Sequence, residues 1–119
     1  MDRYQFITVR GRRILHINLA GIKADEAAAA IETGKQMVSQ EPKVSVLTLT
    51  DITQGQFNVT VIRALQDFTQ FNRPYVRAAA VIGVDGLRRI ALETVEKFSG
   101  RNFAVFATRA EAENWLSLQ

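Results

Sequence analysis

The residues of this sequence that could take part in chemistry or binding gather in one polar stretch between two apolar segments. Five of them fall within ten residues, namely Asp51, Thr53, Gly55, Asn58 and Thr60. A carboxylate and hydroxyls at such a place can serve a catalytic site, stabilise a turn or a helix end, or accept a phosphate group. Asp85 and Gly86 follow a second apolar run in the same way. We therefore expect both stretches to meet at one sheet edge, where open α/β folds place ligand or partner sites.

The residue types in these two stretches give little indication of a catalytic site. Asp51 could be a catalytic carboxylate or a turn former that bonds its own loop, and turn statistics favour the second. His16 is the only histidine, and no second ligand or nucleophile accompanies it, so we expect a structural or surface histidine. The glycines around Asp85 lack the lysine and the spacing of a phosphate-binding loop. The sequence thus predicts no catalytic residue, no metal and no cofactor, and so no enzyme.

The threonines of the polar stretch have two interpretations. Asn58 or Thr60 can cap the helix that follows, and the sequence does not decide between them. Phosphorylation of Thr53 or Thr60 would instead place negative charge near the positive end of that helix. Such a modification would alter the surface more than the fold, which is how a binding module is switched.

Composition excludes several classes of protein. The 119 residues are expected to form one domain, residues 1–119. The absence of cysteine excludes disulfides and thiolate metal sites and favours a reducing, cytoplasmic location. The net charge of +3 comes from 15 basic and 12 acidic side chains, and the basic ones are scattered, so nucleic-acid binding is not predicted. No apolar run is long enough to span a membrane.

Hydrophobic periodicity predicts the elements that must position the polar stretch. Tyr4–Arg10 and Arg13–Leu19 alternate and are joined through Gly11, which indicates an antiparallel hairpin at an edge of the sheet. Asp25–Gln40 has helical spacing. We expect this helix to bury the stripe Ala27, Ile31, Gly34 and Val38.

The rest of the chain alternates strands and helices. A strand beginning at Val44 is apolar on both faces and should be central, and a helix follows it as far as Pro74. A second buried strand is expected within Tyr75–Val84. The next helix is expected to bury Leu87, Ile90 or Ala91, Thr94 and Phe98. A strand within Asn102–Ala107 and a helix capped by Thr108, with Trp115 in the core, complete the chain. The predicted fold is α/β, a mixed five-stranded sheet with the order ββαβαβαβα.

Four segments of this order resemble a known family. They are GRRILHINLAGIK, VLTLTDIT, FNRPYVRAAAVIGVDGL and FSGRNFAVFATRAEAENWL, and with the segments between them they cover nearly the whole chain. Together they resemble the bacterial proteins called stage II sporulation protein AA-like, within the STAS class of anti-sigma-factor antagonists. The resemblance implies a non-enzymatic switch that binds a kinase or an anti-sigma factor.

The regulated members of that class carry a phosphorylatable serine in an aspartate-serine-serine-glycine loop. The loop Asp51–Thr60 contains no serine, and Thr60 lies nearest to that serine's place. The leading hypothesis is a regulatory or protein-interaction module whose unknown protein partner binds this loop and the turn Val84–Leu87, without the phosphoserine motif. The alternative is a domain that binds a small anionic or lipid-like ligand at helix N-termini. The sequence is also compatible with a homodimer.

Overall fold

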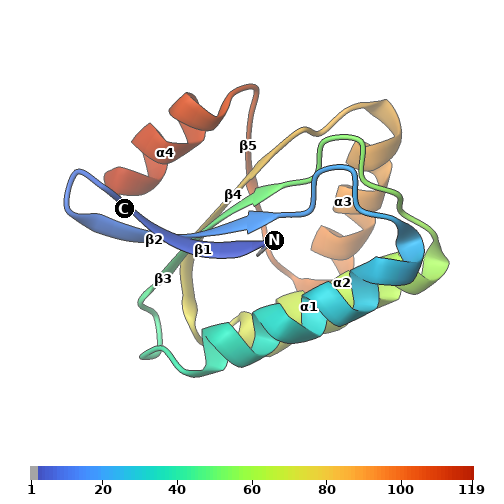
Figure 1. The fold of residues 1–119 in the computed structure, drawn as a ribbon, viewed down its shortest axis with the longest axis horizontal. Helices are drawn as coiled ribbons and strands as arrows, with labels where there is room; N and C mark the ends of the chain where they lie inside the picture. The colour runs from blue at the N-terminus through green and yellow to red at the C-terminus, as the bar shows by residue number, and fades with distance from the viewer. Residues whose placement is uncertain (1–2) are drawn as a thin grey trace.

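The computed structural model describes residues 3–119 as five strands and four helices (Figure 1). They occur in the predicted order: β1 (Tyr4–Val9), β2 (Arg12–Asn18), α1 (Ala24–Ser39), β3 (Val46–Asp51), α2 (Val59–Asn72), β4 (Val76–Ile82), α3 (Gly86–Ser99), β5 (Ala104–Phe106) and α4 (Arg109–Ser117).

The five strands form one mixed sheet in the spatial order β1-β2-β3-β4-β5. The hairpin β1–β2 is antiparallel, with β1 at the edge, and every later neighbour is parallel. The predicted α/β class, the mixed sheet and the central place of β3 are therefore confirmed. Parallel pairing brings the carboxyl ends of β3 and β4 to the same edge, since Asp51 pairs with Ile82.

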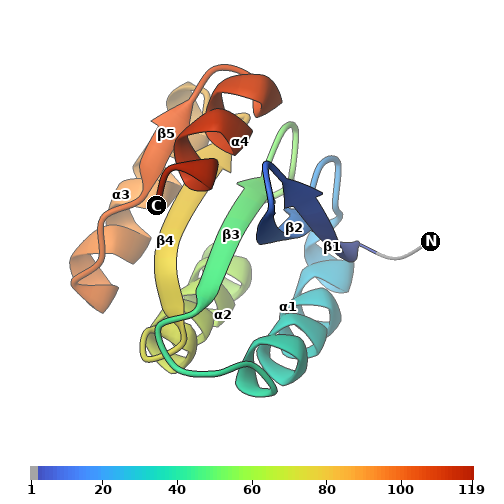
Figure 2. The same ribbon diagram turned by 90° about the vertical axis from the view of Figure 1, so that its left-hand side faces the viewer.

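Helices cover both faces of the sheet (Figure 2). One core cluster joins β2 to α1 and α2 through residues such as Leu15, Ile31 and Phe68. The other joins β2, β3 and β4 to α4, with Leu49 and Leu116 at its centre. This two-sided cover explains why β3 is almost continuously apolar, as a strand buried on both faces must be.

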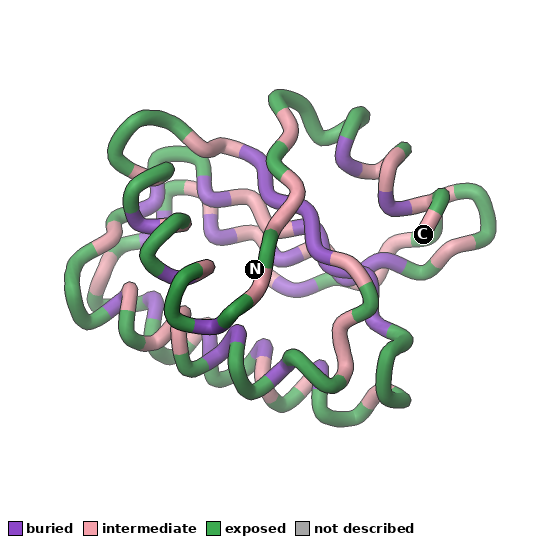
Figure 3. The backbone as a smooth tube through the Cα atoms, turned by 180° about the vertical axis from the view of Figure 1, so that it is seen from behind, coloured by how far each residue is buried: buried purple, intermediate pink, exposed green. Residues whose placement is uncertain are grey.

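Helix α1 buries the stripe that its sequence predicts. Ala27, Ile31, Gly34 and Val38 are its buried residues, and the tube in Figure 3 shows such buried positions recurring along the helices. Gly34 is required because a Cβ there would lie only 2.7 Å from the Tyr4 hydroxyl. That hydroxyl donates a hydrogen bond to the Ala30 carbonyl, which fixes α1 against β1.

The predicted buried face of α3 is wrong. The helix buries Ala91, Val95 and Ser99, whereas Leu87, Ile90 and Phe98 are 81%, 64% and 53% exposed, and Thr94 is exposed too. Two stripes run along this helix, one of large apolar residues and one of smaller residues, and the smaller residues are the buried ones. Of the expected stripe, Ala91 alone is buried.

The start of the central strand also differs from the prediction. Val44 has a positive φ of 57° and is 61% exposed, so it does not belong to the buried strand. The strand β3 begins two residues later, at Val46. The ends of the other elements differ from the predicted ones by up to two residues, which is the usual uncertainty of such boundaries. Within residues 3–119, no helix has the length and apolar character needed to cross a membrane.

Candidate functional site

The loops after β3 and β4 pack directly on each other. The backbone N–H of Ile52 donates to the Ile82 carbonyl at 3.0 Å, which extends the pairing past the strand ends. Gly83 follows, with a φ of +81°, and a Cβ on it would lie 2.3 Å from the Thr53 hydroxyl and 2.4 Å from the Thr53 amide nitrogen. Only glycine permits this approach. The predicted meeting of the two polar stretches is therefore seen in the structure.

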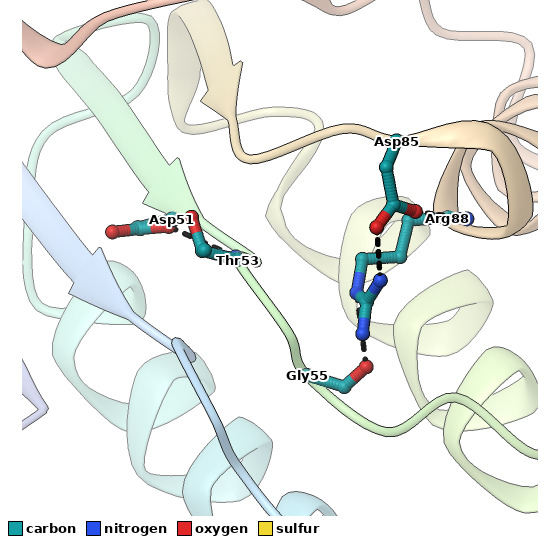
Figure 4. A network of polar contacts seen from close by, with 5 residues as sticks. All are labelled: Asp51, Thr53, Gly55, Asp85 and Arg88. Atoms are coloured by element: carbon teal, nitrogen blue, oxygen red, sulfur yellow. Dashed lines mark hydrogen bonds and ion pairs between the residues drawn. The ribbon is translucent and has the colours of Figure 1, made fainter.

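A second connection between the loops comes from Arg88, on the first turn of α3 (Figure 4). Its Nε donates to the Gly55 carbonyl at 3.1 Å, and its guanidinium forms an ion pair with Asp85. The Arg88 side chain is only 19% exposed while that of Asp85 is 59% exposed, so the pair lies at the rim of the molecule. Arg88 thus ties the buried Gly55 to the start of α3.

Asp51 acts as the turn former. Its Oδ1 accepts hydrogen bonds from the Thr53 backbone N–H at 2.9 Å and from the Thr53 hydroxyl at 2.6 Å. These two bonds fold the chain back at the end of β3 (Figure 4). Thr53 itself is exposed, so its hydroxyl oxygen is presented at the surface next to a carboxylate.

The N-termini of α2 and α3 are capped by their own side chains. Asn58 accepts from the Val61 N–H at 2.9 Å, and Asp85 accepts from the Arg88 N–H at 3.2 Å. The alternative left open by the sequence is thereby resolved, because Asn58 and not Thr60 caps α2. Thr60 is exposed in the first turn, and Gly86 is the exposed first residue of α3, with open space around its Cα.

A hollow open to solvent lies at this edge of the sheet. It is lined by Thr53, Gln54, Gly83, Val84, Asp85, Phe106 and Ala107. Among residues 3–119, no three His, Cys, Asp or Glu side chains are grouped so that they could hold a metal ion. What the arrangement offers is a surface on which the Thr53 hydroxyl, the Gln54 amide and the Asp85 carboxylate are exposed beside apolar side chains.

His16 lies apart from this hollow, on the face of the sheet that carries α4. It follows Ile14 by two residues on β2 and therefore points to the same side. Its Nε2 is buried and has no hydrogen-bond partner within residues 3–119. Burial, and then the charge of Arg109, lower the pKa of His16, while Asp51 and Glu113 act in the opposite direction. It is a neutral, half-buried histidine, in keeping with the structural role expected from the sequence.

Two arginines were missed by reasoning from the sequence. Arg88 was missed because its bond to Gly55 spans 33 positions, although the pair Asp85 and Arg88 at i, i+3 is a visible signal. Arg101 was counted among the scattered basic residues, yet it is half-buried and bonds to Asn72 across 29 positions. No local sequence pattern predicts a contact over such a distance along the chain.

Comparisons with known proteins agree with this architecture. Neither a protein-family model nor a curated protein sequence matches the chain. Among solved structures, the chain is similar to an anti-sigma-factor antagonist (STAS) domain protein from Planctomyces limnophilus. The TM-score is 0.68 at 12% identity, over 96% of this chain and 97% of that one. The expected resemblance is confirmed at the level of the fold, and the chain has the fold of a STAS domain.

Proposed function

We propose that this protein is a non-enzymatic regulatory module that binds a protein partner through the surface formed by Asp51–Thr60 and Val84–Leu87. We call this surface the two-loop surface. The observation that carries the proposal is the contact of Gly83 with Thr53, because it makes one preformed unit of two loops that are 30 positions apart in the sequence. A preformed surface binds a partner without the entropic cost of ordering its loops.

The exposed side chains of the two-loop surface suit a protein partner. Val59 and Leu87, at the starts of neighbouring helices, are 64% and 81% exposed. Polar groups surround them, including the exposed Gln54 and Thr60. An apolar centre with a polar rim is the usual composition of a protein–protein interface. The STAS fold supports the same class of function, since the similar solved structure is described as an anti-sigma-factor antagonist domain.

The alternative of a small anion held at the helix N-termini has less support. An anion there would need free N–H groups, and the side chains of Asn58 and Asp85 already accept from those of Val61 and Arg88. The Asp85 carboxylate would also repel an anion at the start of α3. The two-loop surface therefore favours a protein partner over a small anion.

Regulation by phosphorylation fits Thr60 better than Thr53. A phosphate on Thr60 would lie at the positive end of α2. A phosphate on Thr53 would lie beside the Asp51 carboxylate and would remove the 2.6 Å bond that folds the loop. Thr60→Asp should accordingly raise the free energy of unfolding by about 0.3 to 1 kcal/mol. Thr53→Asp should lower it, and equal shifts in urea unfolding would remove the reason for preferring Thr60.

The proposal is tested by affinity capture from a lysate of the source organism. The parent protein is compared with the double variant Thr53→Ala/Thr60→Ala and with Gln36→Ala on the exposed surface of α1. Mass spectrometry identifies captured proteins and any phosphate on the bait. We expect one partner that is retained by Gln36→Ala and lost by the double variant. A partner retained by every variant would place binding elsewhere, and no partner would contradict the proposal.

A further inference from the structure

A cavity of about 70 Å³ lies between the sheet, α2 and α3, and it reaches the inner side of the two-loop surface at Ile52 and Phe57. Its walls are mostly apolar and include Leu65, Phe68, Ala79, Val81, Ala91 and Val95. A concave, mostly apolar lining with a few polar groups is typical of a small-molecule site. Only a few carbon atoms fit into such a volume, because a cavity of about 150 Å³ is needed for benzene.

One wall of the cavity carries the half-buried Arg101. The guanidinium donates to the Thr69 carbonyl at 3.2 Å and to the Asn72 side-chain oxygen. The ion pairs formed within residues 3–119 do not include it. Burial, and then the nearby Arg73, lower the pKa of Arg101 to about 10. A half-buried arginine is normally paired, so this one offers an anion two or three favourable hydrogen bonds.

The exposed stripe of α3, formed by Leu87, Ile90, Thr94 and Phe98, runs beside Ala91, which lines the cavity. Glu96 lies about half a turn away from Leu87 and Phe98 on the helix, and its carboxylate accepts from the Phe103 N–H at 2.9 Å. That bond directs the Glu96 side of α3 toward β5. The stripe lies on the opposite side of α3, where Leu87, Ile90 and Phe98 are largely exposed. The cavity thus has an apolar approach along α3 with Arg101 near one end.

We propose that this cavity and the stripe of α3 bind a small amphipathic anion. Its headgroup accepts hydrogen bonds from Arg101, and its hydrocarbon chain lies partly in the cavity and partly against Phe98, Ile90 and Leu87. A carboxylate and a phosphate monoester share this chemistry, since a guanidinium forms paired hydrogen bonds with both. The site shares Ile52, Phe57 and Leu87 with the two-loop surface, but Arg101, which would hold the headgroup, lies outside it. The inference therefore goes beyond the proposed function and does not require a protein partner.

The chemistry is tested by titrating the protein with four ten-carbon probes below their micelle concentrations, using calorimetry and NMR. The probes are decanoate, decyl phosphate, decanol and decylamine. We expect at least one of the two anions to bind about tenfold or more tightly than decanol, and decylamine to bind least. The better anion identifies the source as a free fatty acid or a lipid phosphate. If decanol binds as tightly as both anions, or if none of the probes binds, the proposal is wrong.

Three variants locate the site. Arg101→Gln should weaken anion binding about tenfold while leaving decanol binding unchanged. Ala91→Leu, which fills the cavity without removing a charge, should weaken the binding of anions and of decanol alike. Arg89→Gln removes an exposed arginine of α3 and should change neither anion binding nor decanol binding. Circular dichroism confirms that each variant is folded. Equal losses in Arg101→Gln and Arg89→Gln, or full binding by Ala91→Leu, would overturn the assignment.

Discussion

Replacing Gly83 with alanine tests the contact that joins the two loops. The new Cβ would meet the Thr53 hydroxyl at 2.3 Å and the Thr53 amide nitrogen and Cα at 2.4 and 2.7 Å. The hydroxyl can rotate away, but the backbone atoms cannot. Overpacking of this kind costs about 1 to 3 kcal/mol. A non-glycine residue at a φ of +81° lowers the free energy of unfolding by a further amount of about 1 to 2 kcal/mol. Alanine also makes the unfolded chain stiffer than glycine does, which offsets about 0.4 to 1 kcal/mol of that loss.

The expected net loss is about 2 to 4 kcal/mol in the free energy of unfolding, or roughly 10 °C in Tm for a chain of this length. Urea unfolding followed by circular dichroism measures it. Gly11→Ala is the matched control, because Gly11 has a φ of +79° and nothing within 4 Å of its Cβ position. The control should lose about 0 to 1.6 kcal/mol, because it keeps only the cost of the positive φ and the gain from the stiffer unfolded chain. If both variants lose the same amount, the contact between the loops does not constrain them.

Three further predictions concern the elements around the site. Asn58→Ala should cost about 1 kcal/mol in urea unfolding because it removes the cap of α2, whereas Thr60→Ala should cost almost nothing; a reversed order would mean that Thr60 is the cap. Ala80→Asp should cost about 3 to 5 kcal/mol, since Ala80 is 0% exposed in β4, and a variant that melts like the parent would contradict that placement. Folding lowers the pKa of His16, so the unfolded chain takes up its proton first and stability falls as pH drops below about 6.5. His16→Gln should flatten this fall below about pH 6.5, and an unchanged slope would show that another group is responsible.

The sequence predicted the fold well where one pattern had one interpretation. In α1, four small or apolar residues recur at helical spacing, no competing stripe exists, and those four are buried. The apolar run of β3 required cover on both faces and therefore a central place, which the sheet order confirms. The cap at Thr108 was equally clear, because its hydroxyl accepts from the Glu111 N–H at 3.2 Å as a capping box requires. The Glu111 carboxylate accepts from the Thr108 hydroxyl and not from its backbone N–H.

The prediction failed where two patterns overlapped or where the deciding contact was distant. Helix α3 carries one stripe of large apolar residues and one of small ones, and periodicity cannot tell which of them the sheet will cover. Val44 continues the apolar run of β3 but turns away from it with a positive φ. The site residues meet as expected because parallel strands align their ends, yet the bond from Arg88 to Gly55 depends on side-chain geometry that no local pattern encodes.

The two-loop surface is tested most directly by binding isotherms with the purified partner obtained by capture. Thr60→Arg changes one loop and Gly86→Arg changes the other, and both positions are exposed, with open space at Gly86. Gln36→Arg on α1 is the control. The expected result is a Kd raised about tenfold or more by each loop variant and unchanged by the control. A Kd that stays the same in both loop variants would show that the partner binds elsewhere on the molecule.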